Sequence, residues 1–416
     1  AGVRQFNEDK TSTDSEADLG DPLEIAEVEK IEIDDSEWRV GIKTKSTHGE
    51  IETRFGAEYY DKNRDFNTAV FDDSGDLDSE NDEYADFNAE VQGLDLYAVS
   101  QWEISESKEI ELGLRAEYTD LTIEGGDFDN NITEHDEQDW QFSPTLHFRW
   151  HVGDADQFRA SVARTLLRPQ FDQLNPVELT IDDEKFRGNA ELDPEESWGL
   201  DVGYDHFITD KGVVGLNVFY RRVTDLIEYT QSEIVEGGEV FDLREPINNE
   251  DTGIIYGAEL DVSAPATWLS LDNLQWFINL TVLDSEVDDP FFDGLERRFS
   301  GQADYVYNFG FEHELRMWNM SYGMSYQKQG EAEEFEGSEI NTISYDGNLE
   351  VFVEKRFANG KYVVRLSGQN LLDAEKKELI NEYEDFDAYS NNVASSSEVE
   401  REQTEPAILL TLRGRF

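Results

Sequence analysis

Apolar and polar side chains alternate one by one along much of this chain. Residues 109–119 show the pattern clearly: Ile110, Leu112 and Leu114 are separated by polar residues or glycine. The same alternation recurs in four further segments, residues 140–150, 198–205, 362–369 and 406–416. A β-strand has a side-chain period of two, so each segment would be apolar on one face and polar on the other. About sixteen such segments occur from end to end, which predicts an all-β fold.

The apolar content is consistent with strands that expose one face to water. Hydrophobic residues make up 38% of the 416 residues, and no run of about 18 apolar residues could form a transmembrane helix. A membrane β-barrel needs only every second strand residue to face lipid, with water inside. Aromatic residues also gather near strand ends, where interfacial girdles of such barrels lie; they are Trp102, Trp140, Trp150, Trp198 and Tyr220. We therefore expect a transmembrane antiparallel β-barrel.

The connections between the expected strands alternate in length. Short turns are expected near residues 47–49, 105–108, 153–156, 209–212, 314–316 and 358–360, with 264–273 a bulkier member of this set. Long polar stretches fall between them, at residues 62–90, 124–139, 168–195, 231–250, 285–297, 330–341 and 372–405. Outer-membrane barrels have short periplasmic turns and longer external loops. The alternation therefore predicts that all the long stretches lie on the outside of the cell.

Composition and charge limit the kinds of protein that this chain can be. By the strand pattern, we expect residues 24–416 to form the barrel and residues 1–23 to be a polar N-terminal segment. The sequence begins at Ala1 without a signal peptide, as expected of a mature or truncated product. There is no cysteine, which excludes disulfides and thiolate chemistry. The formal net charge of −61 argues against nucleic acid as a partner, because its phosphates would be repelled; salty surroundings or a solubility requirement would explain the acidity equally well.

Several motifs carry a resemblance to a known family. They occur in order, as ELGLRAEYTD at residues 111–120, RASVARTLLRPQFDQLNP at 159–176, GNAELDPEES at 188–197, VFYRRVTDLI at 218–227, YGAEL at 256–260, GQNLLD at 368–373 and the terminal Arg415-Phe416. Together they resemble the C-terminal β-barrel part of TonB-dependent outer-membrane receptors, over about residues 90–416.

The resemblance implies a location and a function. The chain would belong to an outer-membrane receptor that imports a scarce nutrient, such as a siderophore or an oligosaccharide, through a plug-gated barrel. It implies the TonB system as a partner through the plug, and Phe416 as the signal read by the barrel-insertion machinery. Large transporters of this type have about 22 strands and a plugged lumen. Because about sixteen strands are visible and no plug domain precedes them, we expect a fragment, or a barrel completed by another chain.

Two other functions remain open at this point. A passive porin-like channel of about sixteen strands would fit the same strand pattern. A soluble or surface-attached β-scaffold for adhesion or assembly is the third possibility. No catalytic Ser/His/Asp signature, phosphate loop or nucleotide fingerprint is present, so we expect no enzyme activity and no cofactor.

Aromatic residues in the long loops are the candidate ligand contacts. They sit in polar surroundings and could stack on sugars or flat chelates; the alternative is that they pack loop against loop and cap the barrel mouth. The predicted contacts are Tyr84, Phe87, Phe171, Phe186, Phe292, Tyr383, Phe386 and Tyr389. Because the loops are acidic, they should repel anionic chelates, which favours neutral oligosaccharides, peptides or cationic complexes as the cargo.

Metal sites find little support in the sequence. His147 and His151 are four residues apart, which on a strand is about 13 Å, too far for one ion. Residues 72–86 are rich in alternating acids, but Asn81 stands where an EF-hand needs glycine and Phe87 where it needs a bidentate glutamate. A looser loop-bound Ca²⁺ is possible there, and a solvated acidic loop is the simpler interpretation.

Overall fold

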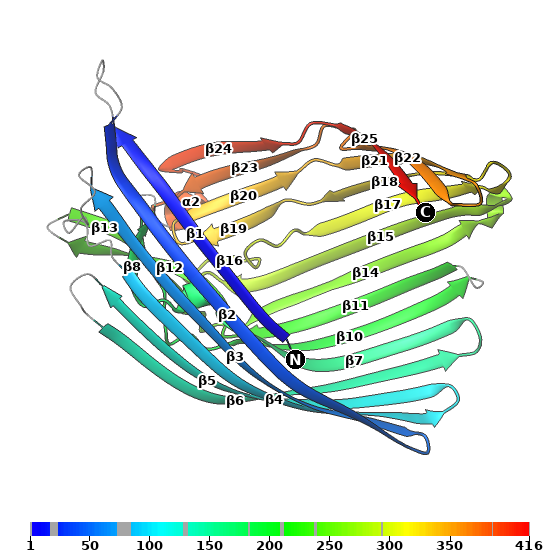
Figure 1. Cartoon of the computed structure of the whole chain (residues 1–416), viewed down its shortest axis with the longest axis horizontal. Coiled ribbons are helices and arrows are strands. Elements are labelled where there is room, and N and C mark those ends of the chain that lie inside the picture. The colour runs from blue at the N-terminus through cyan, green and yellow to red at the C-terminus, as the bar shows by residue number, and fades with distance from the viewer. Residues whose placement is uncertain are drawn as a thin grey trace.

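The computed structural model describes residues 2–16, 24–72, 85–127, 132–181, 184–208, 212–236, 239–292, 294–384 and 386–415. Within these residues one large curved sheet forms a wall around an interior (Figure 1). Sixteen described strands build the wall, each antiparallel to the next one along it. They are β1 (Gly2–Glu16), β2 (Glu24–His48), β3 (Ile51–Asp72), β4 (Ala85–Ser105), β5 (Lys108–Asp127), β6 (Ile132–Val152), β7 (Asp156–Leu167), β10 (Glu195–Ile208), β11 (Gly212–Thr224), β14 (Gly253–Ala266), β15 (Leu271–Asp288), β17 (Tyr305–Leu315), β18 (Met320–Gln329), β21 (Asn348–Phe357), β22 (Tyr362–Gln369) and β25 (Ala407–Gly414). The predicted all-β antiparallel fold and its strand number are confirmed.

The sheet begins earlier than the sequence indicated. Strand β1 pairs with β2 from Gly2↔Arg39 to Glu16↔Glu24, so residues 2–16 belong to the wall and are not a separate polar segment. Their sequence, GVRQFNEDKTSTDSE, has almost no apolar alternation, and backbone pairing leaves no trace in such a pattern. Among the described residues, β1 pairs only with β2, and β25 pairs only with β22.

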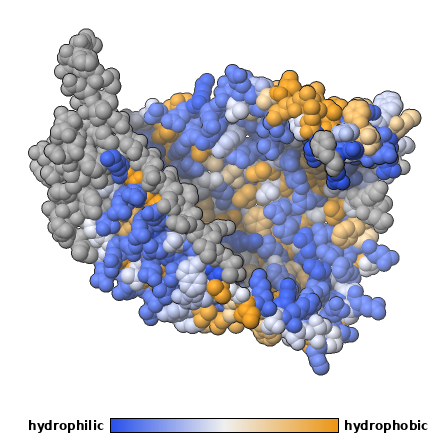
Figure 2. All heavy atoms as spheres, viewed as in Figure 1, coloured by the Kyte–Doolittle hydropathy of each residue, from blue (hydrophilic) through white to orange (hydrophobic). Residues whose placement is uncertain are grey.

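The wall has an apolar outer face. Strand register places Leu112 of β5 opposite Leu146 of β6, and Val162 of β7 opposite Leu200 of β10. Leu112, Leu200 and Leu410 are 40%, 45% and 65% exposed, so none of them lies in a dry protein core. In Figure 2 a hydrophobic patch lies over β25, the strand of Ile408, Leu410 and Leu412. This is the expected lipid-facing perimeter.

The spacing of the outer aromatic residues matches the thickness of the apolar layer of a membrane. Trp140 and Trp150 lie ten residues apart on the outer face of β6 and are 45% and 38% exposed. Ten strand residues at roughly 3.3 Å each, tilted by about 40°, span about 25 Å, the height of the apolar band of outer-membrane barrels. The inner face between them is polar and carries cross-strand ion pairs, for example Arg159 with Asp205 at 2.8 Å.

The two ends of the wall differ as predicted. One end carries the short turns, including η2 (Thr267–Leu269) and η3 (Arg316–Trp318). The long connections at the other end contain α1 (Phe171–Leu174), β8 (Glu178–Ile181), β9 (Glu184–Arg187), β12 (Ile227–Glu236), β13 (Glu239–Asn248), β16 (Glu296–Arg297), β19 (Ala332–Glu336), β20 (Glu339–Tyr345), β23 (Glu375–Glu382), α2 (Phe386–Ser390) and β24 (Ser396–Gln403). Strands β8, β9, β12 and β13 form one small sheet, and β19, β20, β23 and β24 form another. Within the described ranges no helix has the length and apolarity needed to cross a membrane.

Two of the expected long loops are largely strand. Residues 62–72 and 85–90 extend β3 and β4, and residues 124–127 and 132–139 extend β5 and β6. The outer face of these extensions is polar, for example at Asn63 and Glu90, and their inner face is only partly apolar, so the alternation of the membrane band does not continue into them. The wall therefore continues well beyond the Trp140 level, toward the outside of the cell.

Candidate functional site

A long connection folds back into the interior at the external end of the wall. Residues 168–194, here called the inserted segment, run from the end of β7 to the start of β10 and include α1, β8 and β9. Leu174, Ala190 and Leu192 of this segment pack on inward-facing apolar residues of the strand extensions. The wall residues of this cluster are Phe66, Phe87, Ala89, Val91, Leu121 and Ile123. The inner face is thus polar within the membrane band and apolar where it receives the inserted segment.

The Gly188-Asn189 pair of the family-like motif has a structural role. A Cβ atom on Gly188 would lie 2.5 Å from the Asn175 carbonyl oxygen, so no larger residue fits this close backbone approach. The amide of Asn189 donates to the Gln173 carbonyl at 2.7 Å. Its side chain accepts from the Glu191 amide at 2.9 Å. These contacts fold the two halves of the inserted segment onto each other.

Asn248 ties the inserted segment to the neighbouring loop. Its side-chain nitrogen donates to the carbonyls of Asp193 and Asp225, each at 2.9 Å. Its oxygen accepts from the Asp193 amide at 2.8 Å. One carboxamide therefore satisfies three backbone groups that would otherwise have no partner, which favours a single fixed arrangement of both loops.

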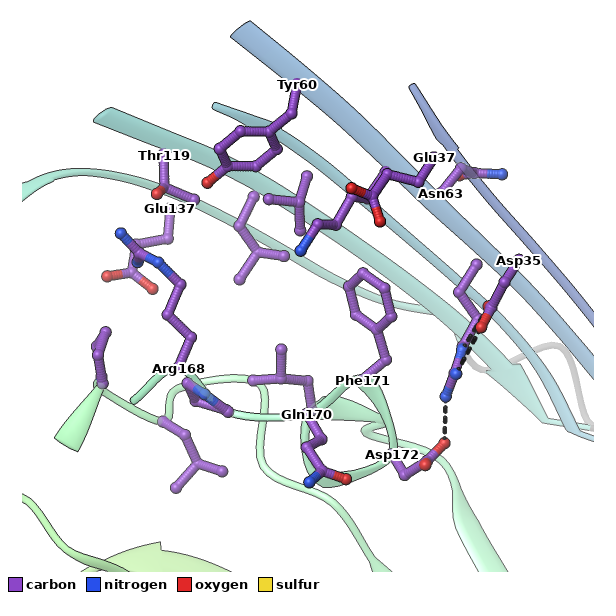
Figure 3. Close-up of a pocket in the computed structure, with 18 of the residues that line it drawn as sticks. Asp35, Glu37, Tyr60, Asn63, Thr119, Glu137, Arg168, Gln170, Phe171 and Asp172 are labelled. Atoms are coloured by element: carbon purple, nitrogen blue, oxygen red, sulfur yellow. Dashed lines mark hydrogen bonds and ion pairs between the residues drawn. The ribbon is translucent and has the colours of Figure 1, made fainter. Parts of the chain in front are cut away.

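Between the inserted segment and the inner faces of β2–β6 lies a cavity of about 480 Å³, here called the recess (Figure 3). The volume falls in the range of small-molecule pockets. Its apolar lining comes from Val91, Leu121, Phe171, Leu174 and Leu192, and its polar lining from Asp35, Glu37, Tyr60, Lys62, Arg64, Thr119, Glu137, Asp139, Arg168, Gln170 and Asp172. An apolar floor with several convergent polar groups is the composition expected of a binding site.

Arg64 joins the wall to the inserted segment beside the recess. Its Nε and Nη2 contact the two oxygens of Asp35 at 2.7 and 2.8 Å, a bidentate pair of fixed geometry. Its Nη1 contacts Asp172 at 2.7 Å, and the guanidinium lies 5.4 Å from the ring centroid of Phe171. Figure 3 shows Asp35, Phe171 and Asp172 on the same side of the cavity.

Arg168 and Tyr60 occupy the other end of the recess. Figure 3 shows the Arg168 guanidinium pointing toward Glu137 and Thr119, near the Tyr60 hydroxyl. The Nη2 atom of Arg168 is shielded from solvent and has no hydrogen-bond partner, so it can donate to a ligand oxygen without giving up a protein contact. Tyr60 is 7% exposed. Its ring fits only because Gly93 has no side chain, since a Cβ atom at that position would lie 2.0 Å from the ring.

A second apolar cluster, rich in aromatic residues, joins the external connections β15–β17, β18–β21 and β22–β25. This loop cap consists of Phe291, Phe292, Leu295, Phe335, Ile340, Tyr383, Phe386 and Tyr389, with Ala388 and Ala394. Phe292 and Tyr389 stack with ring centroids 5.7 Å apart. Burial raises the pKa of the Tyr389 phenol above its ordinary value, and the nearby carboxylate of Glu333 raises it further.

The loop cap stands on a buried ion triad, Glu228–Arg297–Asp289. Arg297 contacts Glu228 at 2.6 Å and Asp289 at 2.5 Å, and the three side chains are 3–6% exposed. Asp289 also accepts from the backbone amides of Phe291 and Phe292 at 2.9 and 2.6 Å. The Arg297 guanidinium lies 4.3 Å from the Phe335 ring centroid. The triad thus joins the β11–β14 and β15–β17 connections, and the Phe335 contact adds the β18–β21 connection.

The predicted ligand contacts fall in different surroundings. Phe171 lines the recess. Phe87 is 1% exposed beneath the inserted segment, and Phe292 and Tyr383 are 1% and 5% exposed in the loop cap, so their rings contact protein; Phe386 and Tyr389 pack around them. The ring centroid of Phe186 lies 6.1 Å from that of Tyr229. Tyr84 and Phe416 lie outside the described residues. Ligand contact by this set stays a prediction.

The sequence did not single out Tyr60, Arg64 or Arg168. Each is an isolated polar residue on a strand or at a strand end, and only the return of the inserted segment brings them together. The available signal was Arg168-Pro169 inside the family-like motif. Among the described residues no three His, Asp or Glu side chains are grouped to hold a metal ion, and most of the acidic stretch at 72–86 lies outside them.

A family model described as "TonB dependent receptor-like, beta-barrel" matches residues 4–374. The ferric-catecholate import receptor Fiu of E. coli K12 is similar, with a TM-score of 0.66 and 11% identity, over 99% of this chain and 60% of that chain. The siderophore receptor PiuA of Acinetobacter baumannii gives 0.64 and 13%, over 94% and 56%. The ferric yersiniabactin receptor FyuA of Yersinia pestis gives 0.62 and 13%, over 90% and 54%.

At these identities the structural likeness shows the fold alone. The chain spans 54% of the length of the first two solved structures that it matches. Among curated proteins, no sequence matches it.

Proposed function

Because this chain belongs to the TonB-dependent receptor family of the outer membrane, we propose that it forms the wall and external loops of an uptake receptor for a scarce nutrient. The family consists of receptors and transporters and not of enzymes. The family membership inferred from the sequence motifs is confirmed by the match over residues 4–374. The outer-membrane location agrees with the apolar perimeter of the wall.

The observation that supports capture at the external end is the recess. It is the place where loop residues enter the interior and where a guanidinium nitrogen of Arg168 is left without a partner. In the proposed function a nutrient binds among the external loops and on the inner wall. Energy for its passage comes from the TonB system through a plug domain, and the barrel-insertion machinery reads Phe416.

Uptake by cells tests this function. Cells that carry the full-length gene should accumulate the nutrient, and accumulation should stop when TonB is deleted or the proton gradient is collapsed. Arg168→Leu should lower the affinity for the nutrient about 10- to 150-fold, since one hydrogen bond to a charged group is lost. Arg316→Leu, in a periplasmic turn, is the matched control. Accumulation that persists without TonB would contradict the proposal.

The comparisons give no support to a passive porin. The two functions differ in planar bilayers. The full-length receptor should show no steady ion conductance, whereas a porin would conduct at once. A steady open channel in the full-length protein would contradict the uptake proposal.

A further inference from the structure

A row of carboxamide side chains crosses the inner wall on the side opposite the recess. Strand register places Asn279 of β15 opposite Asn308 of β17, Asn308 opposite Gln327 of β18, and Gln327 opposite Asn348 of β21. All four occupy inward positions, because their strand neighbours Ile278, Phe309, Tyr326 and Leu349 lie on the outer, apolar face. We call this the amide row.

The amide row borders a cavity of about 770 Å³ at the external end of β17, β18 and β21. Asn308, Gln327 and Asn348 all line it. The side-chain oxygens of Asn308 and Asn348 are shielded and have no hydrogen-bond partner. A buried acceptor that makes no hydrogen bond carries a free-energy cost. A ligand that donates hydrogen bonds to these oxygens would therefore gain binding free energy.

The charge around this cavity selects against anions. Four carboxylates line it, from Asp346, Glu350, Glu375 and Glu402, against two ammonium groups, from Lys328 and Lys376. Lys376 is already paired with Glu378. A ligand bearing carboxylate or phosphate would meet net repulsion, whereas an uncharged one would not.

The cavity adjoins a second one. It shares Lys328, Gln329, Tyr345, Asp346 and Glu375 with a second cavity of about 610 Å³, which reaches toward the β19–β20 hairpin. Tyr345 lines both cavities and can present an aromatic face between them. Such a path suits a chain of several similar units better than one compact molecule.

We propose that the amide row and the adjoining cavities bind an uncharged polyhydroxylated ligand, a neutral oligosaccharide. Carboxamides both donate and accept hydrogen bonds, which matches the paired donors and acceptors of neighbouring sugar hydroxyls. The excess of carboxylates adds acceptors without favouring an anion. This inference rests on the proposed uptake function and specifies its cargo class.

Binding to the full-length receptor in outer-membrane vesicles tests the inference. The probes are fluorophore-labelled neutral glucan, xylan and galactan oligosaccharides of about four to seven units, with oligogalacturonate as the acidic counterpart. We expect at least one neutral probe to bind and oligogalacturonate not to. Asn308→Leu, Gln327→Leu and Gln327→Glu should each weaken binding about three- to tenfold. Tyr345→Phe should retain affinity, and Tyr345→Ala should lose it.

Gln101→Leu is the matched control, because it makes the same change at an inward position of β4, on the opposite wall. Equal loss of affinity in this control, preference for oligogalacturonate, or no neutral binding while TonB-dependent uptake of another cargo persists would overturn the inference. A lowered unfolding midpoint in the row variants with unchanged sugar binding would also overturn it, because the row would then be structural. Absence of any TonB-dependent uptake would instead contradict the proposed function itself.

Discussion

At Arg297 a single guanidinium holds two buried carboxylates, the backbone carbonyl of Arg298 at 3.0 Å, and an aromatic ring. Its side chain is 4% exposed, so water cannot replace these contacts. Burying three charged groups carries a large desolvation cost, and the triad is stable only while it remains complete. The complete triad therefore serves to hold the loops that it joins in a single arrangement.

Arg297→Met should destabilise the external loops by about 3–5 kcal/mol, because Glu228 and Asp289 are left as uncompensated buried charges. Hydrogen exchange of the Phe291 and Phe292 amides, which donate to Asp289, measures the effect. Exchange there should accelerate by at least about a hundredfold.

Arg316→Met is the control for this substitution. Its ion pair with Glu314 is 64% and 44% exposed, so its loss should cost about 1 kcal/mol or less. The triple variant with Glu228→Gln and Asp289→Asn added to Arg297→Met should recover part of the protection, since no unpaired charge remains. Unchanged exchange in the single variant would show that the loops do not depend on the triad.

Among the elements, the inserted segment is attached to the wall by two kinds of contact. Apolar side chains such as Leu192, 2% exposed, pack on the strand extensions. The ion pair between Arg64 and Asp172 lies at the surface, where the Asp172 side chain is 68% exposed. Exposed ion pairs contribute little, whereas buried leucines contribute several kcal/mol. The apolar contacts should therefore hold the segment.

Leu192→Ala should destabilise the inserted segment by about 2–5 kcal/mol and Asp172→Asn by about 1 kcal/mol or less. Limited proteolysis between residues 168 and 194 on outer-membrane vesicles distinguishes them: cleavage should be fast in Leu192→Ala and near wild type in Asp172→Asn. The opposite order would mean that the ion pair with Arg64 is the main attachment.

The β19–β20 hairpin contains a carboxylate that folding makes harder to ionise. Burial raises the pKa of Glu334, and the nearby carboxylates of Glu336 and Glu378 raise it further. A raised carboxyl pKa means that the folded hairpin binds the proton more tightly than the unfolded chain. The hairpin therefore gains stability as the pH falls through the raised pKa toward the ordinary value.

Glu334→Gln should stabilise the hairpin at pH 7 by about 1 kcal/mol or less and should have no effect near pH 3, where the native carboxyl is protonated. The difference in unfolding midpoint between variant and wild type, followed from pH 7 to pH 3, measures this and cancels the titration of other groups. Glu331→Gln, the same change at an exposed position directly before the hairpin, is the control. A constant difference across this range would contradict the prediction.

On the scale of the whole molecule, membrane residence depends on which face of the wall a residue occupies. Leu146 and His147 are neighbours on β6, between Trp140 and Trp150, but point to opposite faces. An arginine on the lipid face near mid-membrane costs about 2–4 kcal/mol, whereas the inner face is wet. The two adjacent positions therefore make a matched test of the barrel.

Leu146→Arg should lower the unfolding free energy in phospholipid vesicles by about 2–4 kcal/mol, and His147→Arg should change it by less than about 1 kcal/mol. Denaturant titration monitored by tryptophan fluorescence gives both values. Similar losses at both positions would mean that β6 does not separate lipid from water.

Period-two alternation predicted the wall because lipid on one face and water on the other impose it, as in residues 109–119 of β5. It failed for β1, whose sequence has almost no apolar alternation, and for the extensions of β3–β6, whose outer face is polar because it lies beyond the lipid. It also missed the recess, because Tyr60, Arg64 and Arg168 meet through the inserted segment over long sequence distances. Gly188 and Asn189 belong to a recognisable sequence motif, but the close backbone contacts that require them are visible only in the packing.

The strand extensions raise the recess above the lipid. Strand β6 begins at Ile132, eight residues before Trp140, so the wall rises about 20 Å beyond the girdle at a tilt of about 40°. In the proposed uptake function, this collar would keep nutrient selection in an aqueous, ion-screened setting, away from the hydrocarbon. A molecule would then be sorted by its hydrogen-bonding groups before it approaches the bilayer, and apolar compounds that partition into the membrane would not pass through the recess.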